Sequence, residues 1–167
     1  MEDSTNICLA CGACCDGTLI GFVQLEHEEV PRLKEIMPIE NADDIGFFLQ
    51  PCSKFCNGCT IYPDRPKQCA KFECGLLSSF EQKHVDFHTA VEIVKAVRQK
   101  RVALESLLAF LPVQLKSQSF YFKMVELNRW LQKNKSELAV TKNQLELRSE
   151  LNLLNSLLMK EFNVSIY

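Results

Sequence analysis

Nine cysteines are the residues of this chain whose type and spacing could carry chemistry. They fall into two groups, which are Cys8, Cys11, Cys14 and Cys15, and then Cys52, Cys56, Cys59, Cys69 and Cys74. Cysteine thiolates bind zinc and iron-sulfur clusters, and a short loop with cysteines at three-residue steps can direct several sulfur atoms at one centre. The clustering therefore predicts metal binding rather than nine independent buried thiols.

The number of cysteines fits zinc and iron-sulfur equally well. Eight thiolates would complete two tetrahedral zinc sites with one cysteine left over. In such sites, the pairs Cys8-x2-Cys11 and Cys56-x2-Cys59 could act as knuckles. Four thiolates would instead bind one iron-sulfur cubane, which leaves five cysteines for a second cluster, for catalysis or for structure. Thiolate ligands suit both metals, so the ligand type alone leaves the choice open.

The first cysteine run differs from a ferredoxin motif in its last member. In that motif the fourth cysteine follows after three residues with a proline behind it, whereas here Cys15 follows Cys14 directly. Adjacent side chains usually diverge, so we expect this pair to serve two centres or to bridge two parts of one. Gly12, Gly17 and Gly58 allow the tight or left-handed backbone that wrapping a metal needs.

The composition is that of an ordinary globular protein with enough apolar residues for a core, because 47% of the residues are hydrophobic and 24% are charged. The net charge of -2 offers no broad attraction to phosphate backbones or anionic membranes, so neither nucleic-acid nor membrane binding is expected. The acidic, polar start and the lack of an 18-residue apolar run predict a cytoplasmic protein. In a reducing cytosol, the cysteines are expected to be metal ligands rather than disulfides.

The overall pattern predicts an α+β chain whose first part is a small, metal-nucleated, cysteine-rich unit with few short strands, over residues 1–80. Strands are expected at 19–25 and 47–49, on either side of a helix at 26–37. Pro31 lies early enough in that helix to be tolerated in its first turn.

The second part, residues 85–167, is predicted to be an all-α helical region, because it has no cysteine or glycine and carries apolar residues at helical spacing. Three helices are expected at about 89–111, 113–133 and 141–160. Thr89 and Thr141 each open a capping-box pattern at the start of a predicted helix. These helices are expected to pack on one another and on the cysteine-rich unit, with a protein partner as the alternative.

Three motifs within residues 5–76 match the signature of a known family. They are CxxCxxCC from Cys8 to Cys15, CTIYPDRPKQC from Cys59 to Cys69, and FEC ending at Cys74. The segment thereby resembles the YkgJ-type cysteine-cluster family, a zinc- or iron-chelating domain that is often labelled as containing an iron-sulfur cluster and that includes flagellin lysine N-methylases. The resemblance implies the ligands Cys8, Cys11, Cys14, Cys15, Cys52, Cys59, Cys69 and Cys74, with Cys56 as an extra.

Two residues inside the second motif are expected to act around the metal ligands. Arg65 either neutralises a thiolate centre or pairs with Asp64 or Glu73 at the surface. Tyr62 either packs beneath the cysteine loop or supplies a phenolic acid. The family signature often has arginine directly after the cysteine that follows R-P, where this chain has Ala70. No role can therefore be assigned to a second guanidinium at that position.

The expected function is that of a metal-binding cysteine-cluster protein with a structural, accessory or redox role. The alternative is an iron-sulfur enzyme of protein modification, similar to a lysine N-methylase, or an electron-transfer protein. The chain has no glycine-rich loop that could bind a nucleotide-like methyl donor, so methyl transfer rests on analogy with the family alone. Whether the protein is an enzyme is left open by the sequence. His84 and His88 have helical i, i+4 spacing but no HExxH glutamate, and they are expected to be solvated.

Overall fold

The sheet that supports the cysteine-rich part is small and antiparallel. The computed structural model describes residues 6–42, 45–134 and 142–167, and within these it has the predicted α+β class. Strand β3 (Ile45–Leu49) lies between β1 (Phe22–Gln24) and β2 (Glu40–Ala42). Val23 lies opposite Phe48, and both are buried against Leu25, Leu33 and Met37. These residues form a small hydrophobic core, which fixes the end of β3 that leads into Cys52.

Short helices connect the cysteines around this sheet. They are α1 (Ile7–Cys11), η1 (His27–Glu29), α2 (Val30–Lys34), η2 (Tyr62–Asp64), α3 (Lys67–Lys71) and α4 (Gly75–Glu81). The single helix predicted at 26–37 is found as two short helices, η1 and α2. A turn follows α2, in which the Met37 N–H donates to the Leu33 carbonyl. The strands predicted at 19–25 and 47–49 are found as β1 and β3. Strand β2 was not predicted.

Three long helices form the second part of the chain. They are α5 (Phe87–Leu108), α6 (Phe120–Lys133) and α7 (Lys142–Phe162). Helix α5 begins before the predicted Thr89, because the Asp86 carboxylate caps it by accepting the Thr89 N–H at 2.7 Å. The cap predicted at Thr141 lies outside the described residues. None of the described helices is long and apolar enough to cross a membrane.

The start of α6 at Phe120 corrects the predicted helix start at 113. The Glu126 carboxylate accepts the backbone N–H groups of Lys116 (2.8 Å) and Ser117 (3.1 Å). These bonds hold the segment that connects α5 to α6 in a non-helical conformation beside α6, the helix that contains Glu126. A side chain ten residues away thus replaces the helical hydrogen bonds that the apolar pattern suggested.

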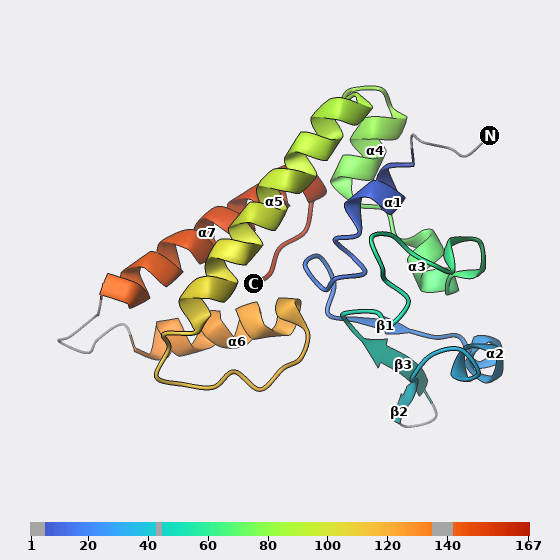
Figure 1. Cartoon of the computed structure of the whole chain (residues 1–167), viewed down its shortest axis with the longest axis horizontal. Coiled ribbons are helices and arrows are strands. Elements are labelled where there is room, and N and C mark those ends of the chain that lie inside the picture. Colours follow the sequence, from blue (N-terminus) through green and yellow to red (C-terminus); the bar gives the residue numbers. More distant parts are fainter. Residues whose placement is uncertain (1–5, 43–44, 135–141) are drawn as a thin grey trace.

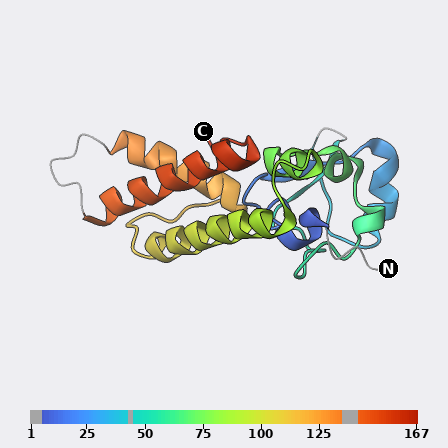
Figure 2. The same cartoon turned by 90° about the horizontal axis from the view of Figure 1, so that it is seen from above.

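The largest hydrophobic core joins the cysteine-rich part to the long helices. Ile7, Cys11 and Leu19 are buried in one cluster with residues of all three long helices, including Val94, Leu127 and Leu151. Helix α1 contacts α5, and α4 contacts α7. Figure 1 shows the long helices gathered on one side and the sheet with the short helices on the other, and Figure 2 shows the same arrangement from above. The first cysteine loop therefore packs against the long helices, whereas Cys52 and Cys69 pack against the smaller core beneath the sheet.

Candidate metal centre

The first cysteine loop is shaped by a single helical turn and the bend that follows it. Asn6 caps α1 through a side-chain oxygen that accepts the Leu9 N–H at 3.2 Å. One turn of helix places Cys8 and Cys11 on the same face. The helix ends at Gly12, which has a φ of +62° and where any side chain would collide with the Phe55 ring. The left-handed backbone favours glycine at this bend, and any other residue would also have to displace the Phe55 ring.

The second group of cysteines is brought to this loop from four separate places in the fold. Strand β3 leads to Cys52, whose N–H donates to the Cys15 carbonyl at 2.8 Å and so ties the two groups together. A tight turn pairs Phe55 with Cys59. Cys69 lies in α3 and Cys74 at the start of α4. Loop, strand, turn and helix ends thus all converge on one region.

Eight of the nine cysteines line one cavity of about 360 Å³, namely Cys8, Cys11, Cys14, Cys15, Cys52, Cys59, Cys69 and Cys74. These are the eight residues that the resemblance implies as ligands. Cys56 is exposed and does not line the cavity, unlike Cys59, the other member of the predicted knuckle. His84 and His88 are exposed and lie outside the cavity as well.

Electrostatic effects between the sulfur atoms divide these eight cysteines into two sets of four. Besides burial, the main cause of each raised pKa is the charge of neighbouring thiolates. Those neighbours define a first quartet, Cys8, Cys11, Cys14 and Cys74, and a second quartet, Cys15, Cys52, Cys59 and Cys69. Between the quartets, the effect links the adjacent Cys14 and Cys15. Cys14 therefore belongs to the first quartet, and its neighbour Cys15 belongs to the second.

Buried thiols in each quartet hold their protons tightly. Burial, together with neighbouring thiolates, raises the pKa of Cys11, Cys15 and Cys69 to about 12. A cation that binds here must displace these protons, which is how thiolate sites couple metal binding to proton release. Among the described residues, no three histidine, cysteine, aspartate or glutamate side chains already stand in the geometry of a metal-ion site. The sulfur atoms line the cavity without converging on one point.

Arg65 and Tyr62 stand at the wall of this cavity. The guanidinium lies 3.9 Å above the Tyr62 ring and donates to the Tyr62 carbonyl at 2.7 Å. Burial raises the pKa of Cys8, while the Tyr62 hydroxyl and the Arg65 charge oppose that rise. Arg65 also opposes the raised pKa of Cys69, so its charge acts on both quartets.

The surface role that the sequence left open for Arg65 is not seen in the described residues. No ion pair joins Arg65 to Asp64 or Glu73, and Asp64 pairs instead with Arg32 at 3.6 Å. The positive charge of Arg65 is therefore left to face the cavity.

Two arginines of α5 hold the first cysteine loop from the side of the long helices. Arg98 donates to the carbonyl oxygens of Ala10 (3.0 Å) and Cys11 (2.7 Å). Arg101 pairs with the Asp16 carboxylate at 3.0 Å and donates to the Asp16 carbonyl at 2.8 Å. Sequence reasoning missed both residues. Their i, i+3 spacing was visible on a predicted helix, but their partners lie more than 80 positions earlier in the chain.

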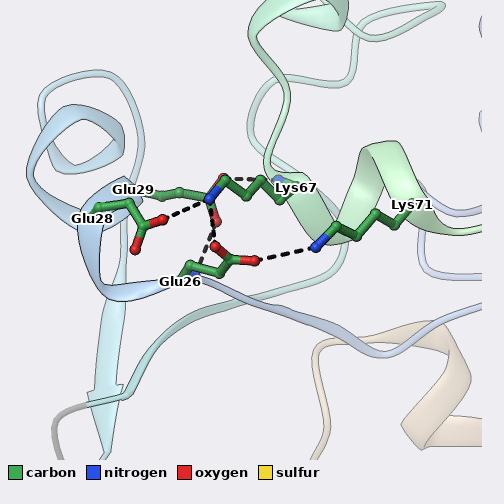
Figure 3. Close-up of polar contacts among 5 residues, drawn as sticks. All are labelled: Glu26, Glu28, Glu29, Lys67 and Lys71. Carbon is green, nitrogen blue, oxygen red and sulfur yellow. Dashed lines mark hydrogen bonds and ion pairs between the residues drawn. The ribbon is translucent and has the colours of Figure 1, made fainter.

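A buried carboxylate anchors the helix that carries Cys69. Glu29 is 6% exposed, and its two oxygens accept the backbone N–H groups of Lys67 at 2.8 Å and of Glu26 at 2.9 Å. Around it, Figure 3 shows Lys67 reaching Glu26 and Glu28, with Lys71 also directed at Glu26. The contact joins the start of α3 to η1.

Replacement of Glu29 by alanine is expected to lower the free energy of unfolding by about 3 kcal/mol, because two backbone N–H groups lose a charged acceptor. Urea unfolding of the metal-free protein measures this change. Glu28 is the matched control, since its exposed carboxylate contacts Lys67 and its loss should be far smaller. Equal losses in the two variants would contradict an anchoring role for Glu29.

Comparison with known proteins agrees with the geometry of the cysteine cavity. The family model CxxCxxCC, described as a putative zinc- or iron-chelating domain, matches residues 7–92, just over half of the chain. The match spans all eight cavity cysteines, and its description supports metal binding through them. Neither the curated proteins nor the solved structures yielded a match. The chain belongs to the CxxCxxCC family of zinc- or iron-chelating domains.

Proposed function

We propose that this protein binds metal at two adjacent four-thiolate centres, one in each quartet. The observation that carries the proposal is that eight cysteines from five separate segments line one cavity and divide four and four by their mutual charge effects. Four thiolates are the ligand set both of a closed zinc site and of an iron-sulfur cubane. The family description supports chelation of either metal.

The residues around the quartets fit a negatively charged metal centre. Two sets of four thiolates carry more negative charge than the metals neutralise, so nearby cations and hydrogen-bond donors are needed. Arg65 and the Tyr62 hydroxyl meet this need at the first quartet, and Arg65 does so at the second. Arg98 and Arg101 fix the loop that presents Cys11, Cys14 and Cys15.

The size of the cavity favours iron-sulfur clusters over single zinc ions. Four sulfur atoms at about 2.3 Å from one zinc ion lie only about 3.8 Å from each other and leave no space between them. A cavity needs about 15 Å³ to hold one water, and this one measures about 360 Å³. A cubane spreads its four thiolates wider, because four iron and four sulfide atoms lie between them.

Two neighbouring clusters would give the protein a redox role. When bound, such clusters supply one-electron oxidation and reduction. The chain contributes partial burial, which limits contact with water, and the Arg65 charge, which stabilises the more negative state of a centre. We infer a module that accepts and passes on single electrons, with zinc in both quartets and a structural role as the alternative.

Metal and acid-labile sulfide analysis of protein purified without oxygen tests this proposal. About eight iron and eight sulfide per chain are expected, with visible absorption that bleaches on reduction by dithionite. About two zinc ions without sulfide would contradict the redox role and support the structural one. Protein that binds neither metal, before or after reconstitution, would contradict both.

A further inference from the structure

One turn in the second cysteine group is closed on itself. We call residues 53–60 the cysteine turn, and half of its residues are exposed. Phe55 donates its N–H to the Cys52 carbonyl at 3.0 Å, where the turn begins, and Thr60 donates its N–H to the Lys54 carbonyl at 2.9 Å, where it closes. In the described part of the chain, every hydrogen bond shown for these residues stays within the turn or reaches Cys52. The turn can therefore move as a unit without breaking hydrogen bonds to the elements around it.

An aromatic side chain fastens the cysteine turn to the first cysteine loop. The Phe55 ring lies over Gly12, where an added Cβ would come within 2.4 Å of it. Phe55 is half-buried and packs in neither of the two hydrophobic cores. A second, looser approach lies beside Leu9, because a Cβ on Gly58 would lie 3.5 Å from the Leu9 carbonyl oxygen. Phe55 is thus the side chain through which the turn rests on the loop.

The cysteine turn carries one ligand of the second quartet, Cys59. This residue lines the cavity and forms a β-bridge with Phe55, so a movement of the Phe55 backbone also moves Cys59. The other three ligands are held by the surrounding fold. Cys52 donates its N–H to the Cys15 carbonyl at 2.8 Å, and Cys69 lies in α3, whose start is bonded to η1. The second quartet therefore combines three fixed ligands with one that moves with the turn.

The first quartet has no such ligand, since all four of its cysteines belong to the large hydrophobic core. Cys11 is buried in that core, and Cys8, Cys14 and Cys74 pack against it. Cys59, in contrast, belongs to neither core. A ligand embedded in a core leaves its metal only when the core opens, and core elements open far less often than exposed turns. The two quartets should therefore differ in how fast they take up and release metal.

We propose that the cysteine turn is a gate for metal at the second quartet, with the Phe55 ring as its latch on Gly12. The inference rests on the proposed function and adds to it a division of roles, in which the second quartet exchanges metal with its surroundings and the first retains it. Opening withdraws the Cys59 thiolate, and a thiolate or nitrogen ligand of an acceptor takes its coordination position. One metal–sulfur bond breaks and one metal–ligand bond forms, so the exchange needs no oxidant or reductant.

The test measures how fast Zn²⁺ leaves the full chain after loading with about two ions per chain. An excess of a chromophoric chelator captures the released Zn²⁺ in a stopped-flow instrument, and two phases of equal amplitude are expected for the wild type. Phe55→Ala should speed one phase about 10-fold, because the turn then opens more often, and leave the other unchanged. Phe22→Ala is the matched control, since Phe22 is 42% exposed, stacks on Phe122 and does not line the cavity.

The Cys11→Ser variant, in which the second quartet alone keeps its four thiolates, assigns the phases. Its Zn²⁺ should leave in the phase that Phe55→Ala accelerates. Phe22→Ala should release Zn²⁺ at wild-type rates in both phases. A single release phase in the wild type would overturn the gate. Acceleration by Phe55→Ala of neither phase, of both phases, or of the first quartet's phase alone would overturn it as well.

Amide hydrogen exchange of the wild type decides the inference should Phe55→Ala fail to fold. In the metal-free protein, the N–H groups of Cys56 and Thr60 should be protected at least about 10-fold less than that of Cys52, and Zn²⁺ should raise their protection. Equal protection at the three positions, or protection that Zn²⁺ leaves unchanged, would overturn the gate. A wild-type protein that binds neither zinc nor iron would instead overturn the proposed metal centres themselves, which separates the two failures.

Discussion

Replacement of Cys69 by serine should remove about half of the bound metal, and replacement of Cys11 should remove the other half. Each substitution takes one ligand from one quartet, and a centre of four thiolates rarely survives the loss of one. A structural metal can contribute on the order of 10 kcal/mol of folding free energy. Both variants should therefore also become sensitive to protease within the first 75 residues.

Metal analysis and limited proteolysis of the purified variants measure both effects. The matched control is Cys56→Ser, because Cys56 is exposed and lies outside the cavity. It should keep the full metal content and the protease resistance of the wild type. Full metal retention in Cys69→Ser and Cys11→Ser would contradict the ligand set. Complete loss in both would contradict the division into two separate centres.

Replacement of Arg101 by methionine is expected to destabilise the metal-free protein by about 3 kcal/mol. Asp16 is only 18% exposed in its side chain, and burial already raises its pKa in spite of the Arg101 charge. Without Arg101, this carboxylate loses its ion pair, and the Asp16 carbonyl and the Thr18 hydroxyl lose a donor. The methionine keeps an apolar side chain of similar length, while the guanidinium above the Phe120 ring and its exposed pair with Glu105 are also removed.

Urea unfolding measures this loss, and a second substitution assigns it. Asp16→Asn in the Arg101→Met background should recover part of the stability, because a neutral amide costs less to bury unpaired than a carboxylate does. Lys95→Met is the control on the same helix, since Lys95 forms an exposed pair with Glu92. An effect of Arg101→Met no larger than that of Lys95→Met would show that the long helices do not hold the cysteine loop through this pair.

Local signals in the sequence were enough to identify the family, the α+β class and the set of cysteines to examine. Spacing at three-residue steps and the motif around Arg65 are properties of neighbouring residues, so they can be read without a fold. Helix α5 was also predicted to within a few residues, because its apolar period repeats over several turns. The predicted cap at Thr89 was wrong. Asp86 and Thr89 are both suitable N-cap residues, and the cap at Asp86 lets the helix begin earlier, at Phe87.

The grouping of the cysteines came only from the tertiary structure. Spacing suggested a knuckle at Cys56 and Cys59, but the turn that pairs Phe55 with Cys59 leaves Cys56 exposed. Cys74 joins the first quartet from about 60 residues away, because the start of α4 packs beside α1. Such choices depend on which helix ends and loops meet across the core, and no local pattern encodes those meetings.

The supporting residues depended on the same long-range contacts. Arg98 and Arg101 belong to a helix whose own pattern concerns the face that packs on the core. They contact the first cysteine loop only because the core brings α5 against that loop. The sequence by itself thus determined which atoms could bind metal, and the tertiary packing decided which of them line one cavity and what surrounds them.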